Sequence, residues 1–120
     1  MKIIIAGGRE FTDYDLLNRK LKDFCDKHGL FLKDIEVVSG AARGADSLGE
    51  QWAVENNVSI KRFKADWDVH GKSAGYRRNA EMADYADALI AFWDGKSKGT
   101  SHMINTATSK QLIIDVHMYT

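Results

Sequence analysis

Short apolar runs alternate with segments of helical periodicity along the whole chain, and this alternation restricts the fold more than any other feature of the sequence. The apolar runs predict five strands, at Lys2–Ala6, Glu36–Ser39, Ser59–Phe63, Ala88–Phe92 and Gln111–Val116. The helical periodicity predicts four helices, at about Asp13–His28, Ala45–Asn56, Ala74–Ala86 and Thr100–Ser109. Strand–helix alternation is typical of a parallel sheet with right-handed crossovers and helices on both faces. The sequence therefore predicts an α/β fold.

The order of the strands in this sheet follows from the doubly wound arrangements that suit five strands. We expect the order 3-2-1-4-5, with 2-1-3-4-5 as the alternative. In either order, ligands bind beyond the carboxyl ends of the strands, at the point where the strand order reverses. The connections that follow the strands are therefore the segments in which binding residues are expected.

Two local patterns refine the helices. Thr12 with Asp15 resembles a capping box at the start of the first helix. The third helix is expected to bury Tyr76, Ala80 and Ala83, which share one face at helical spacing.

Composition narrows the class of protein. The 120 residues are expected to form a single domain, and a hydrophobic content of 44% is typical of a globular one. Lys+Arg and Asp+Glu are both 17, so a strongly basic nucleic-acid module or a polybasic membrane anchor is disfavoured. No apolar stretch is long enough to span a membrane. The single cysteine, Cys25, excludes an internal disulfide. A cytoplasmic protein with no membrane partner is expected.

Glycine and positive charge gather in the four strand-to-helix connections, at about residues 7–12, 39–46, 64–78 and 93–100. These connections hold eight of the 10 glycines, with eight basic and five acidic residues, so their local charge balance is +3 in a neutral chain. Glycine lets backbone approach a ligand closely, and helix N-termini attract anions. The pattern predicts a phosphate-bearing ligand at this edge of the sheet.

The first two connections carry distinct motifs. Gly7-Gly8-Arg9 follows the first strand but lacks the glycine spacing of the dinucleotide fingerprint, so no NAD site is expected. Arg9 is either a phosphate ligand or a solvated loop arginine. Backbone N–H groups of the second connection are suited to a phosphate nest, with Ser39, Gly40, Arg43 and Gly44 as its candidate residues. Asp46 either complements the helix dipole or serves a ribose hydroxyl or a catalytic water.

The last two connections supply further candidates. Gly75, Arg78 and Asn79 lie at the start of the third helix, where arginine can hold phosphate with two hydrogen bonds and asparagine can contact a base or ribose. Lys98, Gly99 and Thr100 lie at the start of the fourth helix, a second candidate phosphate contact. Trp67 and Trp93 are either packed side chains or platforms for a nucleobase.

Metal and cofactor sites are not expected. The four histidines, His28, His70, His102 and His117, show no ligand spacing, and one cysteine makes a zinc site improbable.

These motifs carry a family resemblance. The segment Ser39–Asp46 resembles the "SGxARGxD" turn of DprA-type proteins, and Arg78-Asn79 resembles the start of their following helix. The run from Tyr76 to Thr100 resembles the "ERKAxM…ADAxIALPGGxGT" run of LOG-type phosphoribohydrolases. The whole chain is most similar to the small YspA/YpsA-related domains of the SLOG superfamily, with matching features at Gly7–Phe11, Ser39–Asp46, Trp67 with Gly71, Gly75–Asn79 and Phe92–Thr100.

The resemblance implies a single Rossmann-like, three-layer domain that binds a nucleotide or a nucleotide-derived ligand. LOG-type enzymes cleave the base–ribose bond of nucleoside monophosphates with an arginine and a glutamate. Arg78 matches that arginine, whereas Met103 stands at the position of the glutamate. A carboxylate is needed because the sugar becomes cation-like during cleavage. Asp46 is the preferred replacement, with Glu10 and Asp94 as further candidates, so Asp46, Arg78 and Glu10 are the expected catalytic set.

Three functions are carried forward. The first is a nucleotide-binding domain that hydrolyses an N-glycosidic bond, or that processes or sequesters an ADP-ribose-like signalling nucleotide. The second is a DprA-like module that binds single-stranded nucleic acid. The third is a non-catalytic sensor or adaptor. The resemblance also implies a homo-oligomer, with a dimer expected because SLOG relatives are often dimers.

Overall fold

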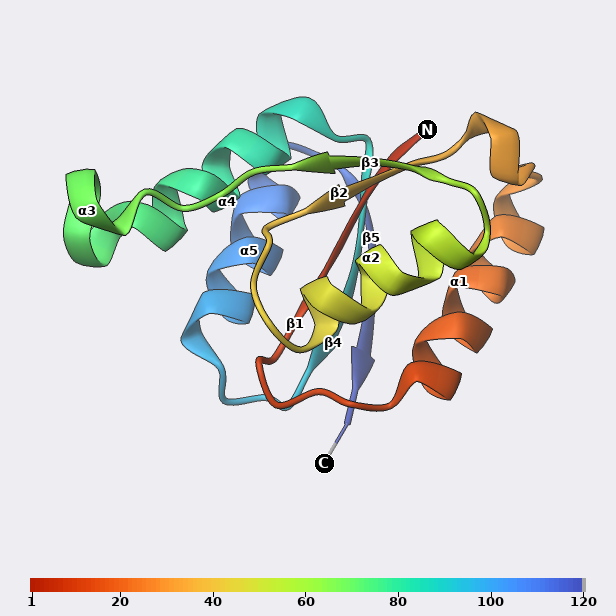
Figure 1. The fold of residues 1–120 in the computed structure, drawn as a ribbon, viewed down its shortest axis with the longest axis horizontal. Helices are drawn as coiled ribbons and strands as arrows, with labels where there is room; N and C mark the ends of the chain where they lie inside the picture. The colour runs from red at the N-terminus through yellow and green to blue at the C-terminus, as the bar shows by residue number, and fades with distance from the viewer. Residues whose placement is uncertain (120) are drawn as a thin grey trace.

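The computed structural model describes residues 1–119, and in it all strands run parallel within one sheet in the order β3-β2-β1-β4-β5. This confirms the order 3-2-1-4-5. The strands are β1 (Lys2–Gly7), β2 (Glu36–Ser39), β3 (Ser59–Arg62), β4 (Ala88–Trp93) and β5 (Ile113–Met118). The order reverses between β1 and β4, which pair from Ile3↔Ala88 to Gly7↔Phe92. The carboxyl ends of β1 and β5 point toward the bottom of Figure 1.

Helices cover both faces of the sheet, as the alternation predicts. The helices α1 (Tyr14–His28) and α2 (Ala45–Glu55) lie on one face, and α4 (Ala74–Tyr85) and α5 (Lys98–Ser109) lie on the other (Figure 1). Alternate residues of β1 divide between the two cores: Ile3 and Ile5 pack with α1 and α2, and Ile4 packs with α4 and α5. All three isoleucines are fully buried, so the central strand has no face in contact with water.

Short elements appear where no helix or strand is expected. The helix α3 (Trp67–His70) and the 3-10 turn η2 (Gly71–Ser73) form the connection after β3, and η1 (Leu32–Asp34) precedes β2. The helix α3 projects beyond the first turn of α4, at the far left of Figure 1. Four residues carry too little hydrophobic periodicity to predict such a helix, although its N-cap, Asp66, is a typical capping residue whose Oδ1 accepts from the N–H of Val69.

Three expected boundaries and faces differ from the structure. Asp13, not Thr12, caps α1, because its Oδ1 accepts a hydrogen bond from the N–H of Leu16. The last strand begins at Ile113 and not at Gln111, whose positive φ of 63° is incompatible with a strand. On α4, Tyr76 is 46% exposed, and Met82 and Ala83 occupy the buried face.

No helix within residues 1–119 is long and apolar enough to cross a membrane.

Candidate functional site

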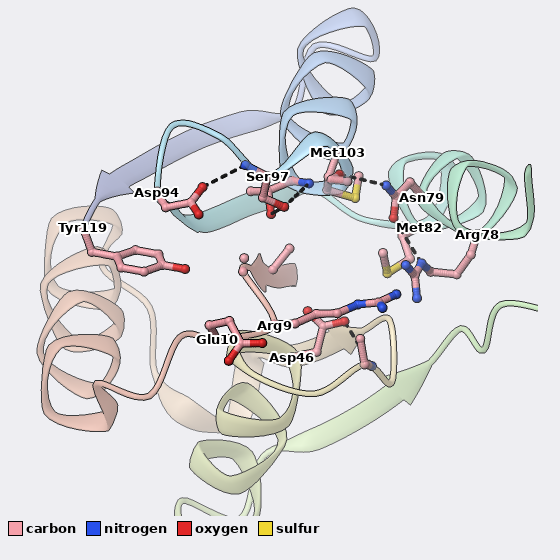
Figure 2. A pocket seen from close by; sticks show the side chains of 16 residues that line it. Arg9, Glu10, Asp46, Arg78, Asn79, Met82, Asp94, Ser97, Met103 and Tyr119 are labelled. Atoms are coloured by element: carbon pink, nitrogen blue, oxygen red, sulfur yellow. Dashed lines mark hydrogen bonds between the residues drawn. The ribbon is translucent and has the colours of Figure 1, made fainter. Parts of the chain in front are cut away.

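A cavity of about 400 Å³ opens at the carboxyl edge of the sheet, between the ends of β1 and β4 (Figure 2). Its walls come from the loop after β1, the start of α2, the middle of α4, the start of α5, and Tyr119 after β5. Nine of the predicted site residues line it: Gly7, Gly8, Arg9, Glu10, Asp46, Arg78, Asn79, Gly99 and Thr100. The cavity therefore lies where the strand order reverses, which is the expected place for a ligand in a doubly wound sheet.

Close backbone packing brings the loops after β1 and β2 together. The carbonyl of Gly8 accepts hydrogen bonds from the N–H groups of Phe11 and Ala45, each at 3.2 Å. A Cβ atom on Gly44 would lie 2.2 Å from this same oxygen, and Gly44 also has a φ of +78°. Glycine is therefore required at this point for α2 to begin against the first loop. At the rim, Arg43 and Glu10 form an exposed ion pair between the same loops at 3.1 Å.

Asp46 is the buried carboxylate of the cavity. It lies in the first turn of α2, is 6% exposed, and accepts a hydrogen bond from the N–H of Ala42 at 3.3 Å. Burial raises the pKa of Asp46 to about 6, against the opposing effect of the Arg78 guanidinium. Its proton is therefore exchanged close to neutral pH, which is the condition a carboxylate needs to act as an acid or a base.

Arg78 is the cation with the larger effect on the pKa of this carboxylate, ahead of Arg9. Its Nη1 donates to the carbonyl of Gly40 at 2.5 Å, and its Nε donates to Oδ1 of Asn79 at 3.1 Å. Burial lowers the pKa of Arg78, and the positive charge of Arg9 acts in the same direction, whereas Asp46 opposes both. Figure 2 shows the side chain of Arg9 extending toward Arg78 above Asp46. Neither arginine belongs to an ion pair within residues 1–119.

Asn79 is held in one orientation by its neighbours. Its Oδ1 accepts from Arg78, and its Nδ2 donates to the carbonyl of Gly99 at 3.3 Å and contacts Nδ1 of His102 at 3.2 Å. Because Nδ2 is a donor, Nδ1 of His102 must be the acceptor, which requires the neutral imidazole with its proton on Nε2. Burial lowers the pKa of His102, which favours that neutral form. Asn79 and His102 therefore position Arg78 through two consecutive contacts.

The loop after β4 presents the N-terminus of α5 to the cavity. Ser97 caps the helix by accepting from the N–H of Thr100, and Oδ1 of Asp94 accepts from the N–H groups of Lys96 and Ser97 at 2.8 Å each. The hydrogen bonds from Ser97 and Lys96 lower the pKa of Asp94. This helix begins at Lys98 and not at Thr100, because Ser97 is its N-cap.

The opposite end of the cavity is lined by acceptors and a hydroxyl. In Figure 2, Glu10, Asp94 and Tyr119 lie away from the guanidinium groups of Arg9 and Arg78, and the Tyr119 hydroxyl points into the cavity. Glu10 pairs instead with Arg43 at the rim. A Cβ atom on Gly8 would lie 2.2 Å from this hydroxyl oxygen, so glycine leaves room for the tyrosine. Burial raises the pKa of Tyr119, and the charges of Asp94 and Glu10 add to the increase. The cavity thus has a cationic end and an acceptor-rich end.

A second cavity of about 230 Å³ adjoins the first. Gly40, Arg43 and Trp67 line it, and Arg9 and Arg78 border both cavities. Three further predicted residues thus come close to the same arginines.

The remaining predicted site residues line neither cavity: Ser39, Gly44, Gly75, Trp93 and Lys98. Ser39 is buried, and its hydroxyl donates to Glu50, which also pairs with Arg62 at 2.8 Å. Trp93 is half-buried, and its Nε1 donates to the carbonyl of Ser97 at 3.1 Å. Gly75 packs beneath Trp67, and Lys98 is exposed on the first turn of α5.

Several residues that line the larger cavity were not among the predicted binding or catalytic residues: Ala6, Ala42, Met82, Ser97 and Tyr119. Met103 was noted only as the residue in place of a glutamate, and Asp94 only as a further carboxylate. Ser97 could have been predicted from the sequence, because a serine just before the apolar positions of a helix is a typical N-cap. Tyr119 directly follows the last strand and so lies at the same edge of the sheet, outside the four glycine-rich connections. No group of three or more His, Cys, Asp or Glu residues within residues 1–119 is arranged to hold a metal ion.

Comparisons with known proteins agree with this architecture. The model of the YspA, cpYpsA-related SLOG family (YAcAr) matches residues 1–70. The Gene 61 protein of Mycobacterium phage D29 is 37% identical over 114 residues, covering 88% of this chain and 87% of that protein. The X-ray structure of DNA processing protein A (DprA) from Streptococcus pneumoniae superimposes with a TM-score of 0.75 over 96% of this chain, at 14% identity. This chain spans about half, 49%, of that DprA chain, and the likeness shows a common fold.

Proposed function

The chain belongs to the YspA, cpYpsA-related SLOG family, and from the geometry of its larger cavity we propose that it binds a nucleotide or a nucleotide-derived ligand there. One observation carries the proposal: Arg9 and Arg78 converge on the cavity without an ion pair within residues 1–119, and Asp46 is the one buried carboxylate beside them. Two guanidinium groups beside one carboxylate leave a net positive charge. A phosphate group would neutralise that charge and accept hydrogen bonds from the N–H groups of the two guanidinium groups.

The acceptor-rich end of the cavity orients the rest of such a ligand. With phosphate at Arg9 and Arg78, a ribose would extend toward Glu10, Asp94 and Tyr119 (Figure 2). Carboxylates accept hydrogen bonds from sugar hydroxyls and would repel a second phosphate at that end. The separation of charge therefore favours a ligand that is anionic at one end and rich in hydroxyl donors at the other.

Asp46 supplies the group for cleavage of an N-glycosidic bond. In the proposed hydrolysis, a water oxygen bonds to the anomeric carbon, and the carbon–nitrogen bond breaks with its electron pair moving to the base. Asp46 accepts the proton that the water loses, the departing base takes up one proton from the solvent, and Asp46 then returns its proton to the solvent. Glu10 is less suited to this role because its side chain is 86% exposed and paired with Arg43, and Asp94 is engaged by two backbone N–H groups. Met103, at the position of the LOG-type glutamate, is a buried apolar wall of the cavity.

The test begins with native mass spectrometry of gently purified protein, which measures a co-purifying ligand and the expected dimer together. Calorimetry with nucleoside monophosphates, dinucleotides and ADP-ribose then measures affinity in the wild type and in Arg78→Ala. We expect this variant to lose about 10- to 100-fold or more in affinity with its fold intact, because charge-assisted hydrogen bonds are lost. Arg77→Ala is the matched control, since Arg77 is exposed on the same helix and contacts Ser73. Equal affinity in Arg78→Ala and the wild type would refute the proposal.

Turnover is measured separately, as free base and sugar phosphate released during incubation. Release that disappears in Asp46→Asn supports hydrolysis. Binding without any release indicates the non-catalytic sensor or adaptor.

The second candidate is a module that binds single-stranded nucleic acid. The observation in its favour is the fold shared with DprA, together with three arginines and the exposed Trp67 at one edge of the sheet. Oligonucleotide affinity that falls steeply with salt concentration would support it, and absence of binding at low salt would eliminate it.

A further inference from the structure

The second cavity has a chemical character different from that of the first. Arg9, Arg43 and Arg78 line it, and no aspartate or glutamate does. The Arg43 side chain is 72% exposed and pairs with Glu10 at 3.1 Å, so its charge is partly compensated. Arg9 and Arg78 form the boundary with the larger cavity. Among residues 1–119, Asp and Glu side chains line the larger cavity and not the smaller, whereas the charges of Arg9 and Arg78 border both.

Trp67 forms the apolar wall of this second cavity. Its side chain is held at the start of α3, whose N-terminus Asp66 caps, and the residue is 50% exposed. A Cβ atom on Gly75 would lie 3.3 Å from the edge of the indole ring, so the ring rests against the first turn of α4 at a point where glycine lets it approach. A half-exposed indole beside arginine side chains is the arrangement that stacks a flat ring next to a phosphate.

We propose that the second cavity is a subsite for the distal half of a two-phosphate nucleotide. The first nucleotide unit occupies the larger cavity, the two phosphates cross between the cavities over Arg9 and Arg78, and a second flat ring stacks on Trp67. This rests on the proposed function, since it requires the first unit to bind beside Asp46. It specifies the ligand class as dinucleotides joined through a diphosphate, in preference to mononucleotides.

The relative sizes of the cavities agree with this division. The larger cavity has about 400 Å³ and also holds the carboxylates that suit a ribose, whereas the smaller has about 230 Å³ and offers an aromatic face with cations around it. Gly40 lines the smaller cavity, and a side chain there would meet both Asp46 and Arg78, which line the larger one. Glycine at this position lets those two side chains approach the boundary between the cavities.

The test compares AMP, ADP and diadenosine diphosphate as probes, because each adds one part of the ligand to the one before. In the wild type, we expect ADP to bind more tightly than AMP, and diadenosine diphosphate more tightly than ADP. In Trp67→Leu, the dinucleotide should lose about 5- to 150-fold in affinity, which corresponds to one stacked base. The affinities for AMP and ADP should stay unchanged in the same variant. Val69→Ala is the matched control, since Val69 lies exposed on the same short helix and lines neither cavity.

Fluorescence provides a second readout that a change in overall stability would not imitate. Trp52 is buried and Trp93 is half-buried, so a base stacked on Trp67 should quench mainly the exposed indole. We expect diadenosine diphosphate to quench the wild type, and the quenching to disappear in Trp67→Leu.

The outcomes separate this inference from the proposed function. If AMP binds but diadenosine diphosphate binds no more tightly, the second subsite is wrong and the nucleotide site stands. The same conclusion follows if diadenosine diphosphate still binds more tightly than ADP in Trp67→Leu. If none of the three probes binds, both proposals fail. Affinity that keeps rising with the length of an oligonucleotide would overturn the subsite in favour of an extended nucleic-acid strand.

Discussion

Asp46 and Arg78 approach each other over Gly40: a Cβ atom on Gly40 would lie 2.7 Å from Oδ2 of Asp46 and 2.8 Å from Nη1 of Arg78. Two segments that are distant in the sequence, the turn from Gly40 to Asp46 and the helix α4, thus meet at one point. The absence of a side chain at Gly40 is what lets the two charges do so. This relationship makes the site sensitive to a single added methyl group.

We expect Gly40→Ala to lower the free energy of unfolding by about 1–3 kcal/mol, because the methyl group must displace a buried carboxylate or a half-buried guanidinium. Affinity for AMP should fall at least tenfold, since Arg78 moves away from its position. Chemical denaturation and calorimetry measure the two effects. For stability, Gly99→Ala is the control, because no atom lies within 4 Å of a Cβ atom there. An unchanged affinity in Gly40→Ala would contradict the arrangement.

The pKa of Asp46, raised from its ordinary 3.8 to about 6, makes folding stability depend on pH. Between these two values the folded state binds more protons at Asp46 than the unfolded state does, so the contribution of this group falls as pH rises from about 4 to 6. At pH 7, where Asp46 is ionised in both states, its burial lowers the free energy of unfolding by about 3 kcal/mol.

Asp46→Asn should remove this dependence and stabilise the protein at pH 7, since the amide oxygen can still accept from Ala42. Denaturation at pH 5 and pH 7.5 measures the difference between the variant and the wild type. A variant that is no more stable at pH 7.5, relative to the wild type, than at pH 5 would show that the Asp46 pKa is not raised.

His102 is expected to be neutral, with its proton on Nε2, because its Nδ1 accepts from Asn79. Nitrogen-15 NMR of the imidazole should therefore report the Nε2–H tautomer and a titration midpoint below the ordinary value of about 6.5. Stability contributed by the neutral form should decline as pH falls below that ordinary value.

His102→Phe serves as the companion variant, because it retains a ring to stack on Tyr76 but removes the acceptor for Asn79. We expect AMP affinity to fall, but by less than in Arg78→Ala, since the guanidinium is present and only its positioning is lost. Observation of the Nδ1–H tautomer in the wild type would refute the positioning contact.

Tyr119→Phe should weaken AMP binding by about 2- to 10-fold, the usual effect of one lost hydrogen bond, because its hydroxyl points into the acceptor-rich end of the cavity. The ring remains to pack edge-to-face on Phe11, at 4.8 Å between centroids, so stability should change little. Tyr85→Phe is the matched control: it also removes one hydroxyl, which contacts Glu36 outside the cavity. Equal calorimetric affinities in both variants would place the ligand away from Tyr119.

Some features of the site could not be read from the sequence because they depend on the direction of a side chain. Trp67 and Trp93 were equivalent candidates for stacking, both in glycine-rich connections. In the structure, the indole of Trp93 donates to the backbone of its own loop, and the indole of Trp67 borders a cavity. Tyr119 was not a candidate, and His102 was considered only as a metal ligand, for a similar reason: neither belongs to a motif, and each acts through a contact with a distant segment.

The sequence by itself determined the sheet and the edge that carries the cavities. Alternation of apolar runs with helical segments, together with the right-handed crossover, leaves few strand orders, and all of them bring the glycine-rich connections to one edge. Only the tertiary structure decided which charges face each other there. Whether Asp46 is a simple helix cap or a carboxylate with a raised pKa depends on its burial and on Arg78, a residue from another helix. Propensity and spacing are local, whereas burial and charge pairing are set by segments that meet only when the chain is folded.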